Sequence, residues 1–147
     1  MELTFGADPE LFLKKGRGFR SSHGIIPGTK EQPHPVKSGA VQVDGMALEF
    51  NIDPAKTAPQ FVRHIRDVMQ ELRRMVPDDY EFAVVPVARF HHAHMKAQPE
   101  DALILGCEPD YNAWTGKVNP RPNQHPTMRT AAGHLHVGWK KKLTTRS

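Results

Sequence analysis

The sequence predicts a single α+β domain in which an antiparallel sheet packs against one long amphipathic helix. A chain of 147 residues can bury one hydrophobic core but not two. Thirteen prolines and eleven glycines indicate many turns between short strands rather than a helical bundle. Only one segment carries apolar residues at sustained helical spacing, so the helix is expected to lie on a sheet built from the rest.

The first strands are predicted near the N-terminus. Apolar residues occupy odd positions between Leu3 and Leu13, which predicts a strand interrupted by a bulge. Pro9 places that strand at an edge or a bend. Residues 14–39 are rich in glycine and proline, which predicts a hairpin followed by a long loop.

A second hairpin is predicted in the middle of the chain. Residues 40–43 and 46–52 resemble strands, and they flank Asp44-Gly45, a dipeptide typical of two-residue hairpin turns. The two strands are therefore expected to pair side by side.

The one long helix is predicted from about residue 58 to residue 76. Its apolar residues recur every three or four positions, and arginines and acids fill the other face. Thr57 and Gln60 have the spacing of a capping box. Residues 80–87 then predict a largely buried strand, and residues 130–139 a final one.

Composition excludes several classes of protein. The formal net charge is +4, and much of the excess lies in residues 140–146, as in a solvated terminus, so no nucleic-acid partner is expected. No apolar run approaches the ~20 residues of a membrane span, and residues 1–13 lack the pattern of a signal peptide. The single cysteine, Cys107, cannot form an internal disulfide, which predicts a cytoplasmic location.

Candidate functional residues occur as three pairs of metal-capable side chains, each pair spaced by two residues. Side chains in a strand alternate with period two, so each pair projects from one face of its sheet. Converging carboxylates repel one another unless a cation or a proton is present. A metal or phosphate site is therefore predicted, and the pairs are Asp8 with Glu10, Glu49 with Asn51, and His134 with His136.

Each candidate also has a purely structural interpretation. Asp8-Pro9-Glu10 alone is typical of a turn, and Glu49 fits an ordinary solvent-facing strand. Arg129 suits either an anionic substrate or a generic surface, and Lys30 is a weak candidate for a phosphate contact because no Walker-type loop surrounds it. The remaining candidates favour structural roles, namely a solvated loop for His91, His92 and His94 and a small buried residue for Cys107.

Five ordered motifs are spread over nearly the whole chain, namely Gly6-Ala7-Asp8-Pro9-Glu10-Leu11-Phe12, Pro27-Gly28-Thr29-Lys30, Gln42-Val43-Asp44-Gly45 with Leu48-Glu49-Phe50-Asn51, Cys107 to Trp114, and Arg129 to Gly138. They resemble the motifs of phage-type carboxylate-amine ligases (amidoligases). This family is similar in fold to glutamine synthetase and glutamate-cysteine ligase. The resemblance implies a sheet that holds Mg²⁺ (or Mn²⁺) and ATP, where a small-molecule or peptide carboxylate is phosphorylated and then attacked by an amine.

The residue patterns and the resemblance agree on a set of expected roles. Carboxylate oxygens suit Mg²⁺, and fixed cations stabilise a transferring phosphoryl group. The expected metal ligands are Asp8, Glu10, Glu49 and His134; the expected ATP contacts are Lys30, Arg129 and His136; and the expected catalytic residues are Glu49, Arg129 and His134.

The sequence departs from the family pattern after the motif Gly133 to Gly138. The family continues into a second half, whereas this sequence ends at Ser147. Residues 1–147 are therefore expected to be the N-terminal part of a larger ligase domain, with little activity alone, or a form completed by self-association or a second chain. The alternatives are an inactive remnant that binds a metal or a partner, and a zinc-dependent hydrolase using the histidine pair and Glu49. The expected location is the cytoplasm, that of the host if the protein is phage-encoded.

Overall fold

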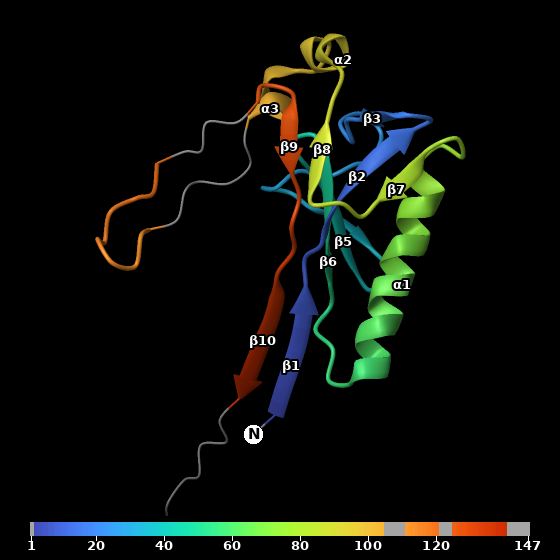
Figure 1. Cartoon of the computed structure of the whole chain (residues 1–147). Coiled ribbons are helices and arrows are strands. Elements are labelled where there is room, and N and C mark those ends of the chain that lie inside the picture. The colour runs from blue at the N-terminus through green and yellow to red at the C-terminus, as the bar shows by residue number, and fades with distance from the viewer. Residues whose placement is uncertain (1, 105–110, 121–124, 141–147) are drawn as a thin grey trace, which may run out of the picture.

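The structure is an α+β fold whose strand ladders are all antiparallel within the described residues. It is a computed structural model that describes residues 2–104, 111–120 and 125–140 (Figure 1). The elements are β1 (Glu2–Ala7), β2 (Glu10–Lys15), β3 (Gly18–Arg20), β4 (His34–Val36), β5 (Gly39–Asp44), β6 (Ala47–Ile52), α1 (Ala58–Met75), β7 (Glu81–Ala83), β8 (Val87–Arg89), α2 (His92–Lys96), α3 (Glu100–Leu103), β9 (Met128–Thr130) and β10 (Leu135–Lys140).

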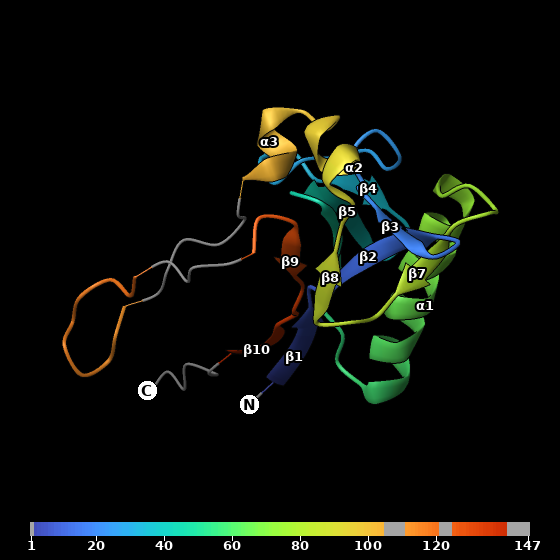
Figure 2. The same ribbon diagram turned by 45° about the horizontal axis from the view of Figure 1, so that its top comes forward.

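The main sheet has the strand order β3-β2-β6-β5-β4, with β7 also paired to β2. There are also two smaller ladders, β1–β10 and β8–β9. Helix α1 runs along one face of the main sheet. The β8–β9 pair lies near β2 on the other face (Figures 1 and 2). The sheet therefore has one face covered by α1 and a second face that is only partly covered.

Alternation along the strands divides the buried side chains between these two faces. Leu11 and Leu48 pack with Val68 and Leu72 of α1 in one core cluster. Phe12, one residue after Leu11, belongs to a second cluster. Its other members come mainly from the β5–β6 turn, β8, α2 and α3, namely Met46, Ala47, Ala88, Phe90, Met95 and Ala102. The second face thus carries apolar residues at one end and is open for polar residues at the other.

Helix α1 begins where the capping pattern predicts. The Gln60 N–H donates to Thr57 Oγ1 at 3.3 Å, which satisfies one of the free N–H groups of the first turn. The Gln60 side chain accepts from the Lys56 N–H at 2.8 Å, one residue earlier than in a standard capping box. The helix ends at Met75, directly before Val76 and Pro77.

Three predicted strands differ from the observed ones, and proline explains two of the differences. Residues 3–13 form two strands in different sheets because the chain breaks at Asp8-Pro9 instead of forming a bulge. Residues 80–87 contain β7 and only the first residue of β8, with Val84-Val85-Pro86 between the two strands, and Val84 is 81% exposed. Proline lacks the N–H that a ladder needs. Residues 130–139 are likewise divided, with 131–134 between β9 and β10.

The central hairpin turns one residue later than its sequence predicts. Asp44 is the last residue of β5 and lies opposite Ala47, so the turn residues are Gly45 and Met46. Gly45 has φ +56°, as the first central residue of a II′-type turn requires. Asp44 consequently projects from the sheet rather than forming the turn.

The histidine-rich segment 91–94 was predicted as a solvated loop, and the structure instead places it at the start of α2. His94 Nε2 accepts the Ser21 N–H at 3.0 Å, and its ring stacks on Phe90. Burial lowers the pKa of His94, and the positive charge of Arg20 lowers it further. His94 is therefore a structural acceptor in its neutral form.

We expect His94 to make folding stability dependent on pH. A protonated imidazole cannot accept the Ser21 N–H, and the folded-state pKa lies below the unfolded value of about 6.5. Stability should be fully present above that value and should fall as pH decreases toward the folded pKa. Urea unfolding at pH 7.5, 6.5 and 5.5 should show a smaller acid-side loss for His94→Gln than for the wild type or for His92→Gln, a control at an exposed position. Equal losses in all three proteins would disprove this role.

Candidate metal centre

Three neighbouring strands place a row of polar side chains on the open face of the main sheet. Glu10 of β2 lies directly opposite Glu49 of β6, and Glu49 lies opposite Gln42 of β5. Asp44 follows Gln42 by two residues, so it shares this face and is a diagonal neighbour of Glu49. Carboxylate oxygens of Glu10, Asp44 and Glu49 lie within 4.8 Å of one another. We call these three residues the acidic triad.

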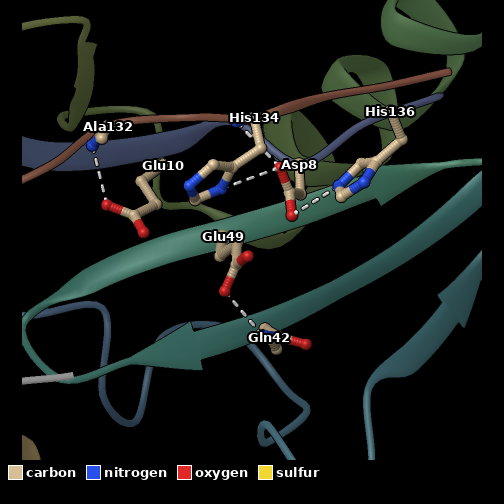
Figure 3. A network of polar contacts seen from close by, with 7 residues as sticks. All are labelled: Asp8, Glu10, Gln42, Glu49, Ala132, His134 and His136. Atoms are coloured by element: carbon tan, nitrogen blue, oxygen red, sulfur yellow. Dashed lines mark hydrogen bonds and ion pairs between the residues drawn. The ribbon is translucent and has the colours of Figure 1, made fainter. Parts of the chain in front are cut away.

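The carboxylates of Asp8 and Glu10 help to hold the segment that joins β1 to β2 against the facing chain (Figure 3). The Asp8 and Glu10 N–H groups donate to the carbonyls of His134 (3.2 Å) and Ala132 (2.8 Å). The return bonds go to side chains, because His134 N–H donates to Asp8 Oδ1 at 2.9 Å and Ala132 N–H donates to Glu10 Oε2 at 2.7 Å. The two carboxylates thus take the place of main-chain carbonyls and are fixed by the facing chain.

The two histidines gather around Asp8 rather than around Glu49. His136 Nε2 lies 3.1 Å from Asp8 Oδ2, and His134 Nδ1 lies 3.4 Å from Asp8 Oδ1. Both imidazoles are mostly exposed, and their ring centroids are 6.4 Å apart. Asp8, His134 and His136 therefore form a second polar group beside Glu10 and Glu49, as Figure 3 shows.

The electrostatics of Glu49 favour a bound proton or cation. Burial raises the pKa of this half-buried carboxyl, and the negative charge of Asp44 raises it further. The hydrogen bond from Gln42 Nε2, 2.7 Å long, opposes that rise, and the charges of Glu10 and Asp8 add smaller increases. A cation held by the triad would favour the ionised form of this carboxyl, so cation binding is expected to strengthen as pH rises.

Lys30 is brought beside the triad by the long loop after β3. Gly28 has φ +89°, a conformation that suits glycine, and its carbonyl accepts the Val43 N–H at 3.0 Å. This contact fixes the loop on β5 and leaves Lys30 Nζ 3.5 Å from Asp44 Oδ1. Both residues line a cleft of about 520 Å³. A ligand in this cleft would contact Lys30 and Asp44.

Arg129, expected to bind an anion, lies in β9 and donates mainly to protein carbonyls. Its Nη1 donates to the carbonyls of Pro126 and Met128, and its Nη2 donates to the Leu103 carbonyl at 3.0 Å. Burial lowers the pKa of Arg129, and its Nε is buried without an acceptor in the described part of the chain. The side chain therefore connects the β8–β9 pair to the end of α3.

We expect Arg129→Lys to lower the free energy of unfolding by about 1–2 kcal/mol. Lysine cannot reproduce the planar fork that reaches carbonyls on both segments, and the loss corresponds to one or two charge-assisted hydrogen bonds. Urea unfolding measures it, with Arg89→Lys at an exposed position of β8 as the matched control. Equal stability of the two variants would show that the contact with Leu103 contributes nothing.

Asp44 is not among the predicted site residues, because the Asp44-Gly45 dipeptide is typical of a hairpin turn. A usable signal was present, since Gln42 and Asp44 alternate with the apolar residues Val41 and Val43. Asn51, the predicted partner of Glu49, is exposed on β6 and lines a different cleft with Asp8 and His136. Cys107 lies outside the described residues.

Comparison of the chain with family models, curated proteins and solved structures finds no match. Among the described residues, no helix has the length and apolar character needed to cross a membrane.

Proposed function

We propose that this chain holds a divalent cation on its acidic triad and serves as the catalytic sheet of an ATP-dependent carboxylate-amine ligase, with a glutamine synthetase-like arrangement. The observation that carries the proposal is the convergence of three carboxylates from β2, β5 and β6 on the sheet face opposite α1. The motif resemblance supplies the reaction class. Three half-buried acids so close together are costly unless a positive charge joins them.

The triad fits Mg²⁺ or Mn²⁺ in its chemistry. Both are bound readily by carboxylate oxygens, and Glu10, Asp44 and Glu49 offer such oxygens within 4.8 Å. When bound with ATP, the cation would neutralise charge on the phosphates. Lys30, beside Asp44, would face the same phosphates, and Asp8 with His134 and His136 would supply hydrogen bonds next to them.

The proposed reaction has two steps. A carboxylate substrate takes the γ-phosphoryl group of ATP, which forms an acyl phosphate and ADP. The amine nitrogen then bonds to the acyl carbon, phosphate leaves, and the nitrogen loses a proton. Lys30 and the triad would serve this chemistry by positioning and electrostatics, whereas Arg129 would position the β8–β9 pair.

Among residues 2–104, 111–120 and 125–140, no contact favours a zinc-dependent hydrolase. That reaction would need the histidine pair and Glu49 around one open metal site. Instead, both imidazoles contact Asp8, while Glu49 accepts a hydrogen bond from Gln42.

An ADP-release assay tests the proposed function. The chain is incubated with ATP, Mg²⁺ and a mixed panel of carboxylates and amines, beside Glu49→Gln and the control Glu81→Gln at an exposed position of β7. We expect weak ADP release that requires an amine, survives in the control and is lost in Glu49→Gln. Cation binding without amine-dependent ADP release would favour an inactive metal-binding remnant. Size-exclusion chromatography of the same samples tests whether activity requires self-association.

A further inference from the structure

Strand β10 has one edge that pairs with no other strand in the described part of the chain. Its other edge pairs with β1, and Figure 1 shows β10 at the outside of this ladder. Phe5 of β1 exchanges main-chain hydrogen bonds with Ala55 on the side away from β10, at 2.8 Å in each direction. Val137, which lies opposite Phe5, therefore belongs to a non-hydrogen-bonded pair, and its N–H and C=O face away from β1. The same alternation turns the main-chain groups of Leu135 and Trp139 to the open edge.

The side chains of these same three residues form an exposed apolar stripe. Leu135 is 78% exposed, Val137 53% and Trp139 69%, and period-two alternation places all three on one face of the ladder. Prolines, bulges and lysines commonly protect such edges, and none interrupts β10 between Leu135 and Trp139. We call these three residues the β10 stripe. The stripe offers apolar surface and outward-facing main-chain groups at the same positions.

The β10 stripe is complementary to itself. When two copies pair antiparallel with Val137 opposite Val137 of the second copy, Leu135 lies opposite Trp139 of the second copy. Residues whose N–H and C=O face the partner form the hydrogen-bonded pairs of an antiparallel ladder, so this register satisfies all three residues. It also keeps their side chains on one face, where they contact one another across the strands. A two-fold axis through Val137 relates the copies, as in an isologous dimer.

A hollow beside the stripe favours the same arrangement. A cleft of about 440 Å³ lies between the start of α1 and β10, and its lining includes Phe61, Val62, Leu135 and Val137. In the register described above, Trp139 of the second copy lies beside Leu135 and therefore next to this apolar cleft.

The apolar area of the stripe is sufficient for a small interface. The three side chains expose roughly 400 Å² in each copy, within the range of apolar patches that are often functional. With the main-chain edges included, a pair would bury about 1,000 Å², which is the lower limit for a specific interface.

We propose that two copies of this chain associate through their β10 edges, with Val137 on the two-fold axis, and so join their β1–β10 ladders into one continuous sheet. Because the interface is small, the dissociation constant should be about 1–100 µM. The inference is independent of the proposed function, since the acidic triad lies on β2, β5 and β6.

Sedimentation velocity on the full chain at about 1–200 µM tests the proposal. EDTA is present, so that the exposed histidines cannot join copies through a metal. We expect the wild type to dimerise, and both Val137→Lys and Val137→Glu to raise the dissociation constant at least about 10-fold, because like charges then face each other on the axis. An equimolar mixture of the two variants should regain dimers, since opposite charges meet. Val84→Lys, at an 81% exposed position between β7 and β8, should dimerise as the wild type does.

Three results would overturn the inference. A wild type that stays monomeric over the whole range would favour a strand from a different protein as the occupant of this edge. A dimer that persists unchanged in both Val137 variants would place the contact elsewhere. A mixture that stays monomeric would contradict the register.

A second measurement leaves β10 unchanged and covers the case in which the Val137 variants do not fold. In Trp114→Phe, Trp139 is the only remaining tryptophan. Its fluorescence should shift to shorter wavelength as protein concentration rises, because the indole leaves water on pairing, and unshifted emission in a sample that sediments as a dimer would contradict the proposal. Dimers without amine-dependent ADP release would refute the ligase alone, whereas an active strict monomer would refute this inference alone.

Discussion

Replacing Glu49 with glutamine is expected to weaken Mn²⁺ binding at pH 7 by about 100-fold, equivalent to roughly 2.7 kcal/mol. The substitution removes the negative charge of a half-buried side chain whose oxygen lies within 4.8 Å of oxygens on Glu10 and Asp44. The amide keeps nearly the same size, so the loss reports charge rather than packing. Calorimetric titration with Mn²⁺ measures the change, and Glu81→Gln should bind Mn²⁺ as the wild type does.

The same variant should be more stable than the wild type when no cation is present. The pKa of Glu49 is raised in the folded state, so ionisation costs folding stability as pH rises above the unfolded-state pKa. Glutamine carries no such penalty, and the apo variant should gain about 1–3 °C in Tm at pH 7. Weaker Mn²⁺ binding together with a lower apo Tm would indicate general damage, and unchanged Mn²⁺ affinity would remove Glu49 from the site.

Replacing Phe12 with alanine is expected to lower the free energy of unfolding by about 3–5 kcal/mol. Phe12 is fully buried, and its ring makes edge contacts with Phe19 and Phe90 at centroid distances of 5.9 and 5.8 Å. Alanine would leave a cavity between β2 and the segment that carries α2. Urea unfolding should show the loss, with a fall in Tm of about 10 °C.

Phe12→Leu provides the matched control for this core position. Leucine retains most of the apolar volume, so its cost should stay near 1–1.5 kcal/mol. Similar costs for the two variants would show that the aromatic contacts and the cavity contribute little. Because Phe12 follows Glu10 by two residues on β2, we also expect Phe12→Ala to weaken Mn²⁺ binding through displacement of that strand.

Local patterns in the sequence predicted much of the architecture. The alternation of Leu48 and Phe50 with Glu49 places the first two in the core beneath α1 and leaves Glu49 on the opposite face. The abundance of turn residues correctly indicated short antiparallel strands. Both signals act between residues close in sequence, so a single chain suffices to detect them.

Local patterns do not predict which residues form the acidic triad. A shift of one residue in the hairpin turn moves a side chain from the turn to the sheet face, and this shift brings Asp44 into the triad. Asp8 belongs to a polar group apart from Glu49 because it accepts the N–H of His134, which is 126 residues away in sequence. No local pattern reports pairing over that distance.

The role of Gly133 was likewise visible only in three dimensions. A Cβ at this position would lie 3.1 Å from the Cα of Pro9, so glycine permits the close approach that lets Asp8 and Glu10 accept main-chain N–H groups. In the sequence, Gly133 was only a glycine beside the histidine pair.

The location of a bound Mn²⁺ tests the central claim most directly. A crystal of the chain grown with Mn²⁺, measured by anomalous diffraction, reveals the ion and its ligands without reference to activity. We expect one strong anomalous peak within coordination distance of oxygens from Glu10, Asp44 and Glu49. A peak bound instead by Asp8, His134 and His136, or no peak on this face of the sheet, would contradict the proposed cation site.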